Sequence, residues 1–144
     1  MKILARQCRK HSQEVIDFPQ IKPLIEEMTK LCVQPIGNYK AGGYALAHCQ
    51  VDHDKPLRFF VTKEGATIIN PKILLREQPF IHIEGCLSYP FRPTKKVKRY
   101  NKIEVEYYMF GFLGKKKKKE TLEGLMACIF QHEIDHFNGI AIYS

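Results

Sequence analysis

The sequence has no hydrophobic run close to the length that crosses a bilayer, which is about 20 residues. Its N-terminal stretch, MKILARQCRKHSQ, also lacks the apolar segment of a signal peptide. No internal repeat, long linker or break in composition divides the 144 residues, and a chain of this length is enough for one domain with its own core. We therefore expect a single domain over residues 1–144, with no membrane-spanning segment.

Paired cysteines are also missing. The chain has five cysteines, which is an odd number, and it has no CxxC pair, so a disulfide framework is not expected. This composition favours a reducing compartment, and we expect a cytoplasmic protein.

Acidic residues are few in relation to basic ones. There are 15 Asp and Glu residues against 23 Lys and Arg residues, so the formal net charge is +8 and the pI is about 9.3. This excess favours contact with an anionic partner, of which nucleic acid is the commonest. Much of it lies in KKVKR at 95–99 and KKKKK at 115–119. A solvated loop is the favoured interpretation of the lysine run, and a binding patch is the alternative.

Apolar periodicity predicts a helix near each end of the chain, with strands between them. Residues 21–33 carry apolar side chains at helical spacing. Residues 112–120 are expected to form a turn, after which Thr121 caps a helix that ends near Asn138, with Gly139 as its stop. Stretches rich in β-branched and aromatic residues predict strands at 57–63, 66–70, 96–100 and 103–110, and the stretch 80–88 predicts a strand that runs into a tight turn at Gly85 and Cys86. The expected fold is α+β, with mostly antiparallel sheets packed around a buried C-terminal helix.

The last helix carries the motif QHEIDHFNG at 131–139. His132 and His136 are four residues apart and so lie on one helix face, with about 5–6 Å between their Cβ atoms. Glu133 directly follows the first histidine. This HExxH spacing offers two ligands for one divalent cation and a general base beside them. Two incidental histidines on a polar face are the alternative, which the apolar remainder of the helix disfavours because unpaired buried His and Glu are costly.

A third protein ligand has to come from upstream, because the closing stretch FNGIAIYS contains no Cys, Asp, Glu or His. Cys128 lies about 12 Å from His136 along the helix axis, too far to share an ion with it. Cys86 stands out because it follows a glycine at an expected strand end, although a lone cysteine is more often a small buried hydrophobe. The open candidates are His48, Cys49, His53, His82, Glu84 and Cys86.

Three motifs together resemble the peptide deformylase family. They are GGYALAHCQ at 42–50, EGCLSYP at 84–90 and QHEIDHFNG at 131–139, and the resemblance runs from about residue 20 to the end. The family's first loop usually reads GxGLAAxQ, and this chain departs from it at Ala45 and His48, which affects the fit of substrate rather than the metal centre. The chain is similar to the short form without a C-terminal extension that is found in bacteriophages.

The resemblance implies the activity and the roles of single residues. The family removes the N-formyl group from N-formylmethionyl nascent peptides. Glu133 would be the general acid and base, while Gln50 and the backbone N–H of Leu87 would stabilise the oxyanion. We expect a monomer in the bacterial or host-cell cytoplasm, with ribosome association through the basic surface. One divalent metal, Fe(II) in the cell with Zn, Ni or Co as substitutes, would be held by Cys86, His132 and His136.

The same resemblance points to a substrate pocket. Counting back from His132 by three, four and seven residues gives positions on the metal-facing side of the helix, namely Ile129, Cys128 and Leu125. Ordinary core packing would produce the same spacing, and the resemblance favours a pocket for the methionine side chain. The substrate path would be lined by Gly43, Tyr44 and Ala45.

Glu84 and Arg99 are expected to support the turn at Cys86. An ion pair between them would brace the turn from outside the ligand set. The alternative for Arg99 is one more surface cation.

Two other functions agree with part of this pattern. One is a different HExxH hydrolase that acts on peptide bonds, but such enzymes usually take a ligand from downstream. The other is a structural metal site in a basic nucleic-acid-binding module, but structural zinc sites are usually closed by four protein ligands. A formylated peptide tested against its unformylated form separates the first from a deformylase.

Overall fold

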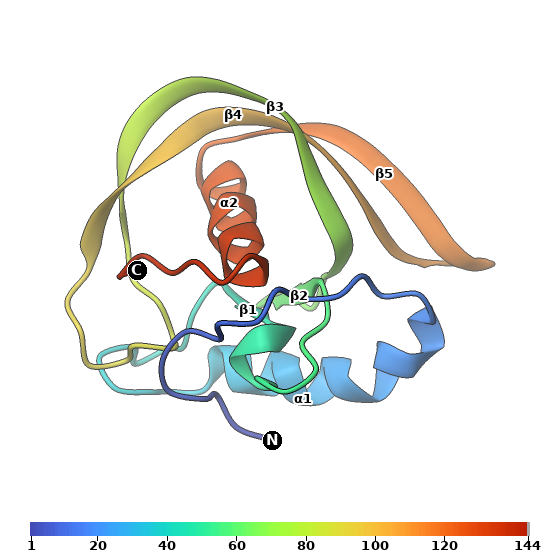
Figure 1. The fold of residues 1–144 in the computed structure, drawn as a ribbon, viewed down its shortest axis with the longest axis horizontal. Helices are drawn as coiled ribbons and strands as arrows, with labels where there is room; N and C mark the ends of the chain where they lie inside the picture. Colours follow the sequence, from blue (N-terminus) through green and yellow to red (C-terminus); the bar gives the residue numbers. More distant parts are fainter. Residues whose placement is uncertain (144) are drawn as a thin grey trace.

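The computed structural model describes residues 1–143 and consists of a five-stranded sheet with a helix near each end of the chain (Figure 1). Each strand pairs antiparallel with its neighbour in sequence, in the order β1-β2-β3-β4-β5. This arrangement confirms the predicted α+β class. The elements are η1 Phe18–Ile21, α1 Lys22–Val33, β1 Ala45–Ala47, η2 His48–Gln50, β2 Phe59–Thr62, β3 Thr67–Glu84, β4 Lys95–Gly111, β5 Gly114–Glu123 and α2 Leu125–Phe137.

The two central strands are longer than the sequence indicates. Most of the stretches 66–70 and 80–88 belongs to one strand, β3, which ends at Glu84, and the stretches 96–100 and 103–110 belong to β4. The middle of β3 is mostly exposed and mixes polar residues with Leu74 and Leu75, and its pairing with β4 is what makes it a strand. Register shifts near Ile69 and Ile73 bend the ladder, and both strands arch over α2 (Figure 1).

The lysine run is a strand, so the predicted turn over 112–120 is wrong for residues 114–120, and only Phe112 and Leu113 form the turn between β4 and β5. Lys115 to Lys119 pair with Phe110 to Glu106 across the β4–β5 hairpin. Thr121 pairs with Glu104 in the same ladder and does not cap the last helix. That helix begins at Leu125, after Gly124 at φ 66°, a backbone conformation that suits glycine. A local pattern could not predict that the lysine run is a strand, because β4 supplies its hydrogen bonds.

The end of the last helix is close to the prediction. α2 ends at Phe137, Asn138 follows as its C-terminal cap residue, and Gly139 has φ +77°. A residue in the left-handed region satisfies the last free carbonyls of a helix, and the amide of Gly139 donates to the His136 carbonyl at 3.1 Å. The predicted stop at Gly139 is therefore confirmed.

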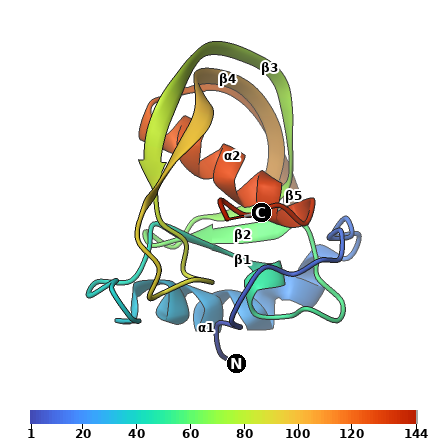
Figure 2. The ribbon, with the colours of Figure 1, turned by 60° about the vertical axis from the view of Figure 1, so that its left-hand side comes forward.

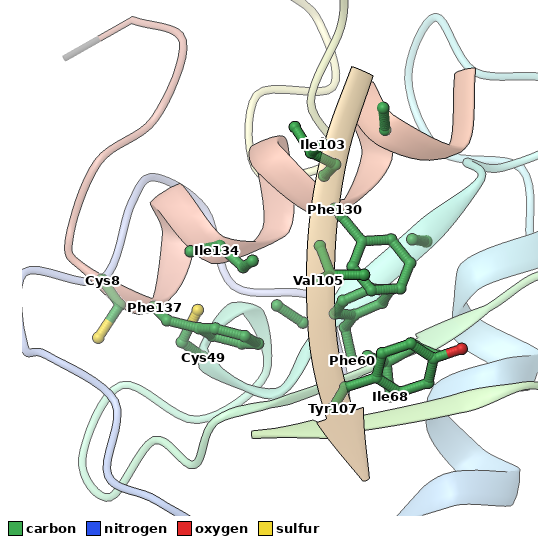
Figure 3. Packing of buried hydrophobic residues seen from close by; sticks show 13 residues of the cluster. Cys8, Cys49, Phe60, Ile68, Ile103, Val105, Tyr107, Phe130, Ile134 and Phe137 are labelled. Carbon is green, nitrogen blue, oxygen red and sulfur yellow. The ribbon is translucent and has the colours of Figure 1, made fainter. Parts of the chain in front are cut away.

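The main core lies between α2 and the inner face of the sheet. Ile103, Val105 and Tyr107 alternate along β4 and face the helix (Figure 3). Phe60 of β2 meets Phe130 of α2 edge to face, with 5.2 Å between ring centroids. Burying each such ring stabilises the fold by about 1.5–3 kcal/mol. This packing holds the motif helix rigidly against the sheet.

The two helices cover opposite faces of the short strands β1 and β2 (Figure 2). α1 closely matches the predicted helix over 21–33 and buries Met28 and Cys32 in a second apolar cluster. Within the described residues, no helix combines the length and the apolar composition that crossing a bilayer requires.

Candidate metal centre and substrate cleft

The motif helix α2 brings its two histidines together. His132 and His136 lie one turn apart on one face, and their Nε2 atoms are 3.2 Å apart. The rings meet at 70°, with 4.8 Å between centroids. Two imidazole nitrogens therefore point at one place.

Cys86 reaches the same place from the turn after β3. Its Sγ atom lies 3.4 Å from His136 Nε2, and the ligand atoms of Cys86, His132 and His136 are all within 4.8 Å of one another. Cys86 and His136 are almost completely buried. Residues 46 and 50 positions apart in the chain thus form one compact donor set, and Cys86 is the upstream candidate that joins the histidines.

Hydrogen bonds on the far side of each ring set its orientation. His132 Nδ1 donates to Glu84 Oε1 at 2.8 Å, and His136 Nδ1 donates to the side-chain oxygen of Gln7. Gln7 in turn donates from Nε2 to the His136 carbonyl at 3.1 Å. Because each Nδ1 faces an acceptor, Nδ1 keeps its proton and Nε2 is the nitrogen through which each ring would bind a metal.

Gln7 is a contact that no motif indicated. It lies in the N-terminal segment, 129 residues before its partner, and only the packing of that segment against α2 brings it there. No signal in the local sequence marks it.

Glu84 and Arg99 form the predicted ion pair. Arg99 donates from Nε and Nη2 to the two Glu84 oxygens at 2.8 and 2.7 Å, and from Nη1 to Asp135 at 2.7 Å. Burial opposes ionisation of Glu84, but hydrogen bonds from His132 and Arg99 hold its pKa well below the usual range. A buried carboxylate is thereby kept charged against the outer nitrogen of His132.

The ionisation of the α2 residues differs sharply from one to the next. Burial lowers the pKa of His132, yet hydrogen bonds to Cys86 and Glu84 outweigh burial and raise that pKa to about 10. Burial, followed by the positive charge of His132, lowers the pKa of His136 well below its ordinary value. Burial also raises the pKa of Glu133 to about 7. A carboxyl with a pKa near neutrality suits both acceptance and donation of a proton.

The donor set fits one transition-metal ion. Cysteine sulfur and imidazole suit Fe(II) and Zn(II), and a set of three protein ligands leaves a position for a further ligand. Glu133 is 4 % exposed, and its Oε2 atom has no hydrogen-bond partner among residues 1–143. Burying such an atom is costly without a partner. A catalytic metal with its own water would supply that partner.

A second group of donors is less suited to a metal. His82, Glu84 and Cys128 also have ligand atoms within 4.8 Å of one another. However, Arg99, His82 and His132 already bind the two Glu84 oxygens through hydrogen bonds. Burial, followed by the charge of Glu84, raises the pKa of the Cys128 thiol to about 11, so its thiolate is scarce at neutral pH.

The other upstream candidates lie away from the donor set. His48 stacks on Phe59 with 5.0 Å between ring centroids, and its Nδ1 accepts the Leu57 amide at 3.0 Å. Cys49 is completely buried in the main core. His53 does not join the ligand group either. The unusual His48 of the glycine-containing loop therefore packs into the core and does not line the cleft.

A cleft of about 400 Å³ opens beside the donor set. On one side it is bordered by the start of β1, on another by the end of β3, and on a third by α2. The positions predicted to contact substrate all line it, namely Gly43, Tyr44, Ala45, Leu125, Cys128 and Ile129. Tyr39, Lys63 and His82 line it as well, and the sequence reasoning assigned them no part in substrate contact.

Gln50 and Leu87 lie at the inner end of the cleft. Gln50 accepts the Ala47 amide at Oε1 and donates from Nε2 to Ser88 at 3.0 Å, and the same nitrogen is 4.0 Å from Cys86 Sγ. The backbone N–H of Leu87 has no protein acceptor among the described residues. Both groups can donate to an oxygen at the donor set.

A thiolate, two imidazoles and a buried glutamate at the head of a peptide-sized cleft are characteristic of a metallohydrolase. A family model described as polypeptide deformylase matches residues 1–144. The chain therefore belongs to the peptide deformylase family, whose members are metal-dependent enzymes.

Relatives in bacteria support this membership. The chain is 33% identical to a peptide deformylase of Thermus thermophilus over 153 residues, covering 94% of this chain and 74% of the relative. It is 40% identical to one of Halothermothrix orenii over 124 residues, covering 81% and 78%. Both matches include most of each protein.

Solved structures of the family share the fold. Peptide deformylase from Thermotoga maritima has a TM-score of 0.81 at 33% identity, covering 99% of this chain and 96% of the other. The enzyme of the Vibrio parahaemolyticus bacteriophage VP16T, in complex with actinonin, has a TM-score of 0.82 at 34% identity, covering 99% and 100%. The chain thus resembles a phage deformylase over its whole length.

Proposed function

We propose that this chain hydrolyses the formamide of N-formylmethionyl peptides, releasing formate and a free amino terminus. The observation that carries the proposal is the buried, unpartnered Oε2 of Glu133 beside the Cys86, His132 and His136 donor set, at the inner end of the cleft. A proton-transfer group next to a metal site is what amide hydrolysis requires.

Each side chain has a definite part in the proposed reaction. Cys86, His132 and His136 would hold one divalent ion, Fe(II) in the cell with Zn, Ni or Co in its place. When bound, the ion polarises the formyl carbonyl and lowers the pKa of a water molecule. Glu133 accepts the proton of the attacking water at Oε2 and later delivers it to the leaving amine, as the C–N bond breaks.

The oxyanion and the substrate have their own partners in this proposal. Gln50 Nε2 and the Leu87 N–H donate to the formyl oxygen, where negative charge develops. The methionine side chain packs against three residues of α2, namely Leu125, Cys128 and Ile129. These three residues line the cleft one and two turns before His132, where an unbranched apolar side chain can rest.

The substrate backbone is proposed to bind as an added strand. From Leu75 to Glu84, β3 pairs only with β4, so its other edge is unpaired within the described residues. The outer edge of β1 is likewise unpaired there. His82, Ile83 and Glu84 of the first edge, together with Gly43 to Ala45 near the second, line the cleft. An extended peptide can donate to and accept from both edges.

The decisive experiment is turnover of formyl-Met-Ala-Ser by the anaerobically prepared, iron-loaded protein. Release of formate and of the free amine is expected, with no cleavage of unformylated Met-Ala-Ser. Cys86→Ser is expected to lose iron and nearly all activity, while Cys32→Ser, a change at a buried cysteine outside the proposed ligand set, keeps its iron. Cleavage of the peptide bonds instead would assign the chain to another class of hydrolase.

We also propose that the protein works as a monomer in the bacterial or host-cell cytoplasm. The ligands, Glu133 and the cleft all come from one chain. All five cysteines are free thiols, which a reducing compartment preserves. Sedimentation at micromolar concentration tests the monomeric state. Because the site is complete in one chain, we expect full activity at concentrations where the protein sediments as a monomer.

Ribosome association through basic residues is a further part of the proposal, at a different place from the lysine run. Lys117 and Lys119 pair with Glu106 and Glu104, so much of the run is neutralised. Arg92, Lys95, Lys96 and Lys98 are among the basic residues that form no ion pair within residues 1–143, and they follow the cleft wall in sequence. Unpaired cations that neutralise RNA phosphates release the counterions held by the RNA, which favours binding at low salt.

Co-sedimentation with ribosomes at increasing salt tests this contact. Changing Lys95, Lys96 and Lys98 to Gln is expected to weaken binding and reduce its salt dependence, by a slope of up to about one per residue. Changing Lys117, Lys118 and Lys119 to Gln, which all form ion pairs on the hairpin, is the matched control. Binding that ignores both salt and the first triple change would exclude an electrostatic contact.

A further inference from the structure

Cys86 depends on its backbone for its place in the donor set. It lies in the turn after β3, and a rotation of that turn would carry Sγ away from the histidines. The carbonyl of Cys86 accepts the Tyr89 amide at 2.9 Å. The N–H of Cys86 donates to the hydroxyl of Tyr39 at 3.0 Å, across 47 residues. One side chain from a distant loop therefore completes the hydrogen bonding of this turn.

The phenol of Tyr39 lies directly against Gly85. A Cβ atom added to Gly85 would be 1.9 Å from the Tyr39 hydroxyl oxygen and 2.7 Å from the adjacent ring carbon. Contacts under 3.0 Å force one partner to move. The glycine before Cys86 is therefore required by the tyrosine that holds Cys86.

The loop that carries Tyr39 is itself anchored. The backbones of Ile36 and Tyr39 exchange two hydrogen bonds of 2.9 and 2.8 Å, and the Asn38 amide donates to the Pro90 carbonyl at 2.7 Å. A Cβ atom at Gly37, which has φ +52°, would be 2.3 Å from that same carbonyl oxygen. The loop between α1 and β1 and the segment after β3 lie side by side (Figures 1 and 2). Tyr39 is thus held at both its backbone and its hydroxyl.

We propose that Tyr39 is a positioning residue for the metal centre, fixing the Cys86 thiolate and the adjacent Leu87 amide through the Cys86 backbone. The inference rests on the proposed function insofar as it assigns Cys86 to the metal. Without the Tyr39 hydroxyl, the Cys86 N–H loses its only hydrogen-bond partner among the described residues. A buried donor left unpaired is costly, so the turn rotates toward another acceptor and carries the sulfur with it.

Tyr39→Phe in the cobalt-substituted protein tests this role. The change is expected to weaken Co(II) affinity about tenfold, as the loss of supporting hydrogen bonds does at other metal sites, and to shift the thiolate-to-cobalt charge-transfer band. Affinity is measured by competition with a chromophoric chelator. The matched control is Tyr108→Phe, because Tyr108 packs in the same apolar cluster and its hydroxyl has no partner among residues 1–143. Its affinity and band are expected to match the wild type.

Unchanged affinity and an unchanged band in folded Tyr39→Phe would overturn the proposal. If that variant does not fold, amide exchange in the zinc-loaded wild type decides the question. The Cys86 amide is expected to exchange as slowly as that of Cys128, which donates to Gly124 at 3.1 Å in α2. Exchange at the rate of a free amide would exclude the hydrogen bond. A wild type that shows the cobalt–thiolate band but does not turn over formyl peptides would refute the proposed function and leave this inference standing.

Discussion

The candidate metal centre and the β4–β5 hairpin are both rich in charge, but their ion pairs differ in how much they contribute to stability. Arg99 Nη2 lies 2.7 Å from Glu84, and both side chains are 6% exposed. Lys119 lies 3.2 Å from Glu104, with exposures of 61% and 33%. Distances are similar, whereas solvent screens only the second pair. The buried pair orients His132, one of the proposed metal ligands, and the exposed ladder only balances charge on a strand.

The largest expected effect comes from making the same change, Glu to Gln, once in each of the two regions. Glu133→Gln is expected to reduce kcat about 10³-fold, because a positioned proton-transfer group contributes about 10²–10⁴-fold. Glu104→Gln on the hairpin is the control and is expected to keep full activity. Formate release is measured, together with metal content, which both variants keep. A fully active Glu133→Gln would remove this residue from the reaction.

The next effect concerns stability. Arg99→Met leaves Glu84 buried without its cation, and breaking a buried pair costs about 3–5 kcal/mol. Lys119→Met removes an exposed pair and is expected to cost at most about 1 kcal/mol. Urea denaturation of both metal-free variants gives the two free energies of unfolding. Equal losses would show that burial does not set the weight of these pairs.

Metal removal should lower the Tm by an amount that depends on the Cys86, His132 and His136 site and not on the hairpin ion pairs. At a free metal concentration of 100 times Kd, binding stabilises the folded state by about 2.7 kcal/mol. Chelation is therefore expected to lower the Tm of the wild type and of Lys119→Met equally. Cys86→Ser should show little metal-dependent shift. The same shift in Cys86→Ser as in the wild type would mean that the sulfur does not bind the ion.

The smallest effect is expected from the lysine run. Lys115 and Lys116 form no ion pair within the described residues. Replacing both by Gln is expected to change the free energy of unfolding by less than about 0.5 kcal/mol. Metal affinity and turnover should stay as in the wild type. Thermal unfolding and a chelator titration measure both. A large loss of stability would reveal a contact of the run that the hairpin pairing does not explain.

Sequence reasoning succeeded where the relevant spacing is local. The helical pairing of His132 and His136 follows from four residues of separation, and the stop at Gly139 follows from glycine's access to the left-handed region. Both are properties of one segment. The same reasoning failed for the lysine run and for Thr121, because those residues form a strand only through pairing with β4.

The supporting contacts were the hardest to foresee. Gln7 and Tyr39 have no motif around them, and each acts on a residue at least 47 positions away. The Arg99–Glu84 pair was expected as a brace for the Cys86 turn, but its third partner, Asp135, was not. Long-range hydrogen bonds leave little trace in a single sequence because any polar residue can make them.

The sequence by itself determined the class of the protein: an HExxH helix, a cysteine after a glycine, a loop ending in glutamine and an excess of basic residues. Helical periodicity and ligand chemistry act over a few residues and can be read locally. Only the tertiary structure decided that Cys86 meets the two histidines, that Glu133 is buried beside them, and that Gln7, Glu84 and Tyr39 support them. The reason is that a buried polar group needs its partner within about 3 Å, and which partner arrives there depends on how the whole chain packs.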